Sequence, residues 1–124
     1  MTEFWALGLG GFFGATARYY IATFANRIFG PGFPYGTLTV NILGCFLLGF
    51  IATATDDKLN ITPLVRTFLT VGMLGAFTTF STFSVETLSL LREGNVSVAF
   101  ANVFLSLAVG MLAAYGGMTS ARWI

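Results

Sequence analysis

Histidine is absent from this 124-residue chain, and cysteine and charged residues are scarce. Without histidine, the chain has neither a histidine-based catalytic triad nor a histidine ligand for zinc. Its single cysteine, Cys45, allows no disulfide within the chain. Charged residues make up 9% of the sequence, and the net charge of +1 gives no basic footprint for nucleic acid. These absences argue against an enzyme and against a nucleic-acid-binding protein.

Hydrophobic residues, in contrast, make up 56% of the chain, which is typical of a membrane protein. A helix needs about 20 apolar residues to cross a hydrocarbon core of about 30 Å. The first apolar run is too long and too rich in glycine for a signal peptide, and no positive stretch precedes it. We therefore predict an all-α membrane protein with one domain, residues 1–124, and four transmembrane helices at about residues 4–25, 35–55, 63–91 and 96–118.

Small residues mark one face of the first span. Gly10 and Gly14 stand one helical turn apart, so this face allows the close approach of a neighbouring helix. Arg18 lies one turn further along the same face, where an unpaired charge is costly. Two interpretations of Arg18 are open: its side chain reaches to the lipid headgroups, or it attracts anions at a vestibule.

Polar residues recur every four positions in the second and fourth spans. Thr37, Asn41 and Cys45 share one face of the second span, and Asn102 and Ser106 share one face of the fourth. The fourth-span spacing predicts a polar face that contacts protein rather than lipid. The Asn41 amide either joins two helices or lines a pathway, and the Ser106 hydroxyl on its own could bond the backbone of its own helix.

The third span is too long for one straight helix across the membrane. Residues 63–91 would measure roughly 43 Å as a helix, against a hydrocarbon core of about 30 Å. Gly72 and Gly75 lower the helix propensity just before a run of hydroxyl residues at 78–84. Hydroxyl side chains can satisfy the backbone groups that a break releases. We therefore predict a mid-membrane break, and irregular backbone at this depth usually lines a site.

Two phenylalanines follow this break. Phe80 and Phe83 lie three residues apart and project from nearly the same helical face, with Glu86 three residues beyond them. Phenylalanines at helical spacing usually pack in a core, but hydroxyl residues separate these two. Both core packing and a role in the site are therefore open for the pair.

Positive charges fall almost equally on the two sides of the predicted bundle. The positive-inside rule therefore selects no orientation, and we expect insertion in both orientations. Opposite copies could pair about a two-fold axis in the membrane plane, as an antiparallel homodimer. The side with both termini carries Lys58, Arg66 and Arg122, and the other side carries Arg27, Arg92 and, by position, Arg18.

Three stretches carry a resemblance to a known family: GGFFGATARY at 10–19, GTLTVNILGCFLLG at 36–49 and GMLGAFTTFSTFSVE at 72–86. With these stretches the chain resembles the CrcB, or Fluc, family of fluoride channels along essentially its whole length. The resemblance implies a passive fluoride-selective channel that exports fluoride across the bacterial inner membrane and relieves its toxicity. It also implies a dual-topology antiparallel homodimer with a broken third helix, two pores and no organic cofactor.

The resemblance also assigns residues. It implies that the side chains of Asn41, Phe80 and Phe83 line each pore and that a structural sodium ion lies at the dimer centre. Backbone carbonyls of Gly75 and Thr78 would hold this ion. With the faces described above, the full candidate fluoride pathway is Arg18, Thr37, Asn41, Thr79, Phe80, Ser81, Phe83, Asn102 and Ser106.

Two other classes of membrane protein are alternatives. A small proton-coupled multidrug exporter also has four spans and dual topology, but it needs a buried carboxylate in its first span. This chain has Arg18 there, and its intramembrane acid, Glu86, lies late in the third span. A non-transporting membrane subunit would explain the small-residue faces but not polar residues on three spans.

Overall fold

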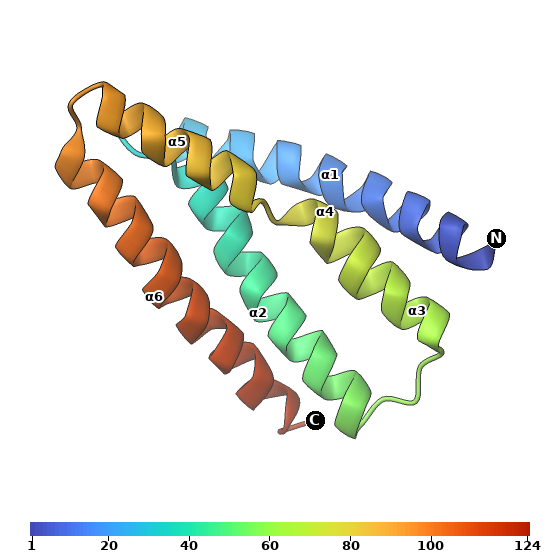
Figure 1. Ribbon diagram of the computed structural model, residues 1–124. Coiled ribbons are helices and arrows are strands. Elements are labelled where there is room, and N and C mark those ends of the chain that lie inside the picture. The colour runs from blue at the N-terminus through green and yellow to red at the C-terminus, as the bar shows by residue number, and fades with distance from the viewer.

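The computed structural model describes all 124 residues as an all-helical protein (Figure 1). Three helices are continuous: α1 (Thr2–Phe29), α2 (Tyr35–Asp57) and α6 (Val96–Ala121). The predicted third helix is divided into a short helix α3, a π-helical turn η1, a short helix α4 and a longer helix α5. Their bounds are Pro63–Thr67 for α3, Phe68–Leu74 for η1, Gly75–Phe77 for α4 and Phe80–Arg92 for α5.

Three helical segments are long and apolar enough to cross a membrane: α2, the interrupted stretch from Pro63 to Arg92, and α6. The prediction of spans at these places is therefore supported by length and composition. Helix α1 has 28 residues but is less apolar, since Arg18, Tyr19 and Tyr20 lie together within it. The place of α1 in the membrane stays a prediction.

The break predicted in the third helix is present, and it lies at Thr78 and Thr79. Both residues have extended backbones, with φ −88° and ψ 159° at Thr78 and φ −153° and ψ 112° at Thr79. Gly75, which lowers the helix propensity in the sequence, is itself helical, with φ −61° and ψ −37°. Its N–H still bonds to the carbonyls of Gly72 and Thr70, so the helix continues through it.

The first half of the third helix packs closely on α1. A Cβ atom on Gly10 would lie 2.6 Å from the Phe68 carbonyl oxygen, and one on Gly14 would collide with the Met73 carbonyl oxygen. Across the contact, a Cβ atom on Gly72 would lie 3.1 Å from the Ala6 carbonyl oxygen. The small-residue face predicted on the first span is therefore confirmed as a helix contact.

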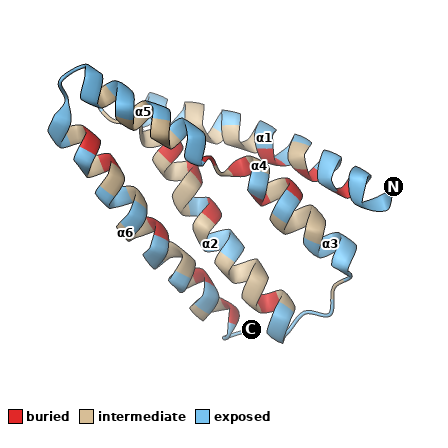
Figure 2. Ribbon diagram, in the orientation of Figure 1, coloured by how far each residue is buried: buried red, intermediate tan, exposed pale blue.

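Helices α2 and α6 form a second close pair, where Gly49 faces the Ala114 carbonyl and Gly117 faces the Phe46 carbonyl. Buried residues lie on α1, α2, η1, α4 and α6, whereas the short helix α3 and the longer helix α5 have none (Figure 2). Only 18 of the 124 residues are buried in all. The isolated chain therefore leaves most of its apolar surface for lipid or for another protein.

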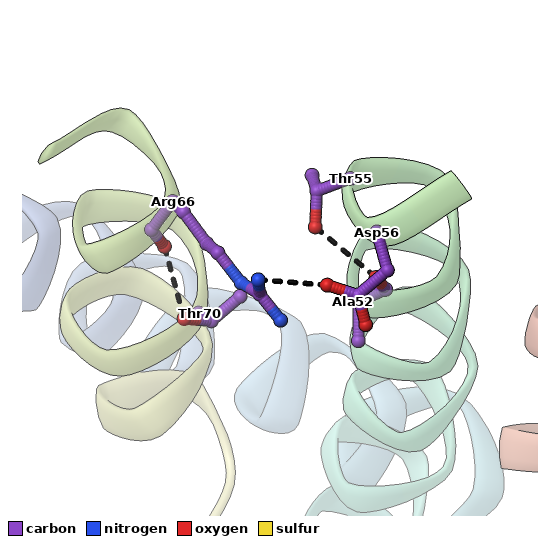
Figure 3. Close-up of polar contacts among 5 residues, drawn as sticks. All are labelled: Ala52, Thr55, Asp56, Arg66 and Thr70. Atoms are coloured by element: carbon purple, nitrogen blue, oxygen red, sulfur yellow. Dashed lines mark hydrogen bonds and ion pairs between the residues drawn. The ribbon is translucent and has the colours of Figure 1, made fainter. Parts of the chain in front are cut away.

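The connection between α2 and α3 is tied by an ion pair at the edge of the bundle (Figure 3). Arg66 Nη1 lies 2.7 Å from Asp56 Oδ1, and both side chains are about half exposed, at 46% and 54%. Thr70 Oγ1 donates to the Arg66 carbonyl at 2.9 Å one turn later. The pair thus joins the end of α2 to the start of the third helix.

Candidate functional site

A hollow of about 270 Å³ lies where the break in the third helix meets α2 and α6. Five of the predicted pathway residues, from three different spans, meet there: Asn41, Thr79, Phe80, Phe83 and Ser106. The hollow is completed by Gly44, Cys45, Leu48, Thr78 and Leu107. The structure therefore brings the core of the predicted site together, although these residues span 41–106 in the sequence.

The Asn41 side chain pairs with the backbone of Thr79 at the break. Its Nδ2 donates to the Thr79 carbonyl at 3.0 Å, and its Oδ1 accepts from the Thr79 N–H at 2.8 Å. The amide thus bonds the extended backbone as a neighbouring strand would. One of the two Nδ2 hydrogens is used in this pairing. Asn41 therefore joins two helices and also lines the hollow, and its part in an ion pathway stays a prediction.

The side chain of Thr79 begins helix α5. Its Oγ1 accepts from the Thr82 N–H at 3.3 Å, as an N-cap residue does. The same oxygen donates to Thr82 Oγ1 at 3.0 Å and lies 3.4 Å from Ser81 Oγ. Ser81 itself is exposed and does not line the hollow. The Thr79 hydroxyl is therefore already used in capping helix α5 and in its bond to Thr82.

The rings of Phe80 and Phe83 border the hollow side by side. Their centroids lie 5.7 Å apart with the ring planes at 44°. Phe80 is 77% exposed, and Phe83 is partly buried. A ring that is so exposed contributes little to a core, so packing within this chain does not explain Phe80.

Ser106 brings a free hydroxyl to the hollow. Its Oγ is buried and has no hydrogen-bond partner, so it does not bond the backbone of its own helix. Buried hydroxyls are nearly always hydrogen-bonded, and an exception calls for an explanation. An anion or a water molecule in the hollow would supply the missing partner.

The other predicted pathway residues lie outside the hollow. Thr37 Oγ1 donates to Glu86 Oε1 at 2.8 Å, one turn along α2 from Asn41. Asn102 is 1% exposed, and its Nδ2 donates to Thr87 Oγ1 at 3.0 Å. These bonds use both groups for contacts between helices. The polar face of α6 does contact protein, as predicted.

Arg18 is partly buried on α1 and forms no ion pair. It does not line the hollow. The structure therefore supplies neither an acidic partner nor a position in the site for this arginine. Its two interpretations from the sequence both stay predictions.

Two backbone carbonyls beside the break lose their usual helical donors. In a continuous helix, Thr79 N–H would donate to Gly75 and Thr82 N–H to Thr78. These N–H groups donate instead to Asn41 Oδ1 and to Thr79 Oγ1. Carbonyl oxygens released in this way are ligands that suit a hard cation. Gly75 and Thr78 carry these two carbonyls, and their role as sodium ligands stays a prediction.

Sequence reasoning missed three features of this site. A methyl of Thr78 fills the space that a Cβ atom on Gly44 would need. Cys45 lines the hollow, and its four-residue spacing from Asn41 was a signal for this. Thr87 is the partner of Asn102, and its position four residues after Phe83 places it on the same face of α5. No local pattern indicates the close fit of Thr78 to Gly44.

Comparison with known proteins gives one family for nearly the whole chain. Residues 5–118 match the family model described as "CrcB-like protein, Camphor Resistance (CrcB)". A Clostridium perfringens protein named "Fluoride-specific ion channel FluC" is 47% identical over 116 residues, which are 94% of this chain and 91% of that protein. "Fluoride-specific ion channel FluC 1" of Moorella thermoacetica is 48% identical over 116 residues, covering 94% and 83% of the two chains. The FluC protein of Shewanella halifaxensis is 47% identical over 111 residues, covering 90% and 89%.

Proposed function

This chain belongs to the CrcB-like family, and we propose that it is a fluoride-specific ion channel, as its relatives are named. The observation that supports this function best is the hollow at the break. There a buried, unpartnered hydroxyl of Ser106 lies with the Asn41 amide and two aromatic rings. The protein is a multi-pass membrane protein, and we place it in the bacterial inner membrane.

The hollow offers hydrogen-bond donors without a fixed positive charge. Fluoride is small and strongly hydrated, so a pore must replace its water with other donors. The second Nδ2 hydrogen of Asn41 and the hydroxyl hydrogen of Ser106 can serve in this way. No lysine or arginine lines the hollow. The ion is therefore bound weakly enough to leave, which conduction requires.

The two rings add a weaker attraction. The edge of an aromatic ring carries the positive part of its quadrupole. Ring edges of Phe80 and Phe83 turned toward the hollow would attract fluoride without holding it tightly. This role also gives a reason for the large exposure of Phe80.

The direction of transport follows from the membrane potential. Fluoride enters cells as neutral HF at acid pH and is trapped inside as the anion. A potential of 100 mV, negative inside, is worth about 2.3 kcal/mol for each charge. A passive channel therefore exports fluoride from the cytoplasm without a coupled proton. The match to the channel family favours this reading over a proton-coupled multidrug exporter.

We further propose that two copies form an antiparallel homodimer with one pore for each hollow. Helix α5 has no buried residue, and its apolar side chains Phe80, Val85 and Leu88 are 77%, 64% and 60% exposed. A second copy would cover this surface. The nearly equal positive charges on the two sides favour insertion in both orientations. A reporter at the C-terminus should then be found on both sides of the membrane, and a single orientation would contradict the antiparallel arrangement.

The same dimer would place a structural sodium ion between the two breaks. The released carbonyls of Gly75 and Thr78 from each copy would hold it. When bound, the ion would supply a positive charge that favours anions nearby. Within this chain, Asn41 keeps the Gly75 carbonyl available by taking the Thr79 N–H.

Ion efflux from liposomes tests the proposed function. Purified protein is reconstituted into liposomes loaded with potassium fluoride or potassium chloride, and valinomycin starts the efflux. We expect rapid fluoride release at a fluoride electrode and slow chloride release from matched liposomes. Equal release of both anions would contradict fluoride specificity. Fluoride release no faster than from protein-free liposomes would contradict a channel altogether.

A further inference from the structure

We propose that Asn102 and Thr87 form a hydrogen-bond relay that positions the Phe83 ring at the hollow. The proposal rests on the fluoride-channel function proposed above. Asn102 Nδ2 donates to Thr87 Oγ1 at 3.0 Å, and Thr87 Oγ1 donates to the Phe83 carbonyl at 2.7 Å. The relay therefore runs from α6 through one hydroxyl to the backbone of the residue that carries the ring.

Helix α5 needs such positioning because apolar packing does not supply it. None of its residues is buried in the chain, although it carries both rings of the site. Side-chain hydrogen bonds tie it to its neighbours at Thr79, Glu86 and Thr87. Hydrogen bonds have directional preferences that apolar contacts lack. These bonds therefore fix the rotational orientation of α5 about its own axis.

The bond from Thr87 to Phe83 also acts on the backbone. A threonine that bonds the carbonyl one turn earlier often bends its helix. The donation from Asn102 selects this arrangement, because Thr87 Oγ1 must present a lone pair to Asn102 while its hydrogen points to Phe83. Asn102 thereby favours one rotamer of Thr87 and one local geometry at Phe83.

Asn102 acts through Thr87 rather than on the ion. It is 1% exposed and is absent from the lining of the hollow, whereas Ser106, one turn later on α6, lines it. Its amide points to α5 and is bonded there. Asn102 and Thr87 are therefore positioning residues, and Phe83 is the residue that meets the ion.

Fluoride efflux from liposomes tests the relay. Thr87→Val keeps the shape of the side chain but removes the hydroxyl, and we expect efflux about fivefold slower, as expected for the loss of one net hydrogen bond. Thr87→Ser restores the hydroxyl and should restore most of the rate. Thr119→Val is the matched control, since Thr119 makes the same bond to the Tyr115 carbonyl at 2.9 Å at the far end of α6. It should release fluoride at the native rate.

A double variant separates positioning from simple stability. Thr87→Val alone leaves the Asn102 amide buried without its partner, which destabilises the fold. Thr87→Val with Asn102→Leu removes both partners and should recover stability against denaturant, while efflux stays slow. Recovery of efflux together with stability would overturn the relay.

A Phe83→Ile background completes the test. If the relay acts through the ring, Thr87→Val should cause no further slowing there, because the ring is already gone. A further fivefold loss would overturn the proposal, as would native efflux from Thr87→Val in the native background. Absence of fluoride efflux from the unmodified protein would instead overturn the channel function itself, so the two failures are distinguishable.

Discussion

The two halves of the third helix are held in different ways. The half before the break, from α3 to α4, packs its backbone directly on α1 through Gly10, Gly14 and Gly72. The half after the break, α5, has no buried residue and is tied to α2 and α6 by side-chain hydrogen bonds. The first half is thus held by close backbone packing, and the second half by a few directional hydrogen bonds.

Because of this difference, the first half can present backbone carbonyls at the break, and the second half can orient the two aromatic rings. Close backbone contact leaves the first half little freedom, so it can present carbonyls at the break in fixed positions. Polar bonds hold α5 at few points and set the direction of Phe80 and Phe83. Substitutions at the junction, in the rings and in the glycine contact should therefore have different consequences.

The largest effect is expected at the junction of the two halves, from Asn41→Asp. A carboxylate cannot donate to the Thr79 carbonyl and repels an anion in the hollow. Because this repulsion acts on the ion in the pathway, fluoride efflux should fall by about a hundredfold or more. The folded dimer should persist on gel filtration.

Asn60→Asp is the control for this change of charge, since Asn60 is exposed in the connection before α3. It should leave efflux unchanged. Native efflux from Asn41→Asp would show that the amide only packs between helices. A dissociated protein would lead to the same conclusion.

Replacement of either ring in the second half should have the next largest effect. Isoleucine has no quadrupole and offers no positive edge, so Phe80→Ile or Phe83→Ile should slow fluoride efflux by about tenfold or more. Swaps of similar volume usually cost under about 1.5 kcal/mol of stability, so the fold should persist.

Phe104→Ile provides the comparison, because Phe104 is 70% exposed on α6 and lies outside the hollow. It should conduct as the native protein does. Native rates from both Phe80→Ile and Phe83→Ile would remove the rings from the pathway and leave them as space-filling residues.

A smaller effect, on stability, is expected in the first half. The added methyl in Gly14→Ala would collide with the Met73 carbonyl, and such overpacking costs about 1–3 kcal/mol. Gly11→Ala is the matched control, since a Cβ atom there meets nothing within 4 Å. Unfolding by denaturant in detergent measures both. Equal stability of the two variants would mean that the close contact at Gly14 does not hold this half in place.

The smallest effect is expected at the edge of the bundle, from Asp56→Asn. The pair with Arg66 is about half exposed, and exposed ion pairs contribute about 0–1 kcal/mol. Stability should therefore fall by less than about 1 kcal/mol, and fluoride efflux should not change. Asp57→Asn, which breaks no ion pair, is the reference. A much larger loss would show that this connection, rather than the glycine contact, holds the first half.

Local sequence patterns predicted much of this arrangement. The glycine spacing indicated the α1 contact, and the four-residue polar spacing placed Asn41 and Ser106 on faces that meet at the hollow. The exact position of the break could not be predicted in this way. Thr79 leaves the helix because Asn41, which lies 38 residues earlier in the chain, takes its N–H. Helix propensity depends only on neighbouring residues, so it marks Gly72 and Gly75 but not Thr79.

Asn102 illustrates the same limit. Its spacing correctly predicted a buried polar face, but spacing does not identify a partner on another helix. The structure pairs Asn102 with Thr87. This contact between helices depends on the orientation that α5 takes after the break. Likewise, no local pattern in the sequence predicts the π-helical turn at Phe68–Leu74.

The pairing of Asn41 with Thr79 also constrains the order of events during insertion and folding. Until α2 lies alongside, the Thr79 N–H and C=O would face lipid without partners, and each such group costs several kcal/mol there. The segment from Pro63 to Arg92 should therefore enter the membrane as one continuous helix and open at Thr78 and Thr79 only when it docks. In Asn41→Ala we expect the continuous helix to persist, with slower amide hydrogen exchange at Thr79 than in the native protein. The extended backbone would then be a product of helix assembly and among the last features to form.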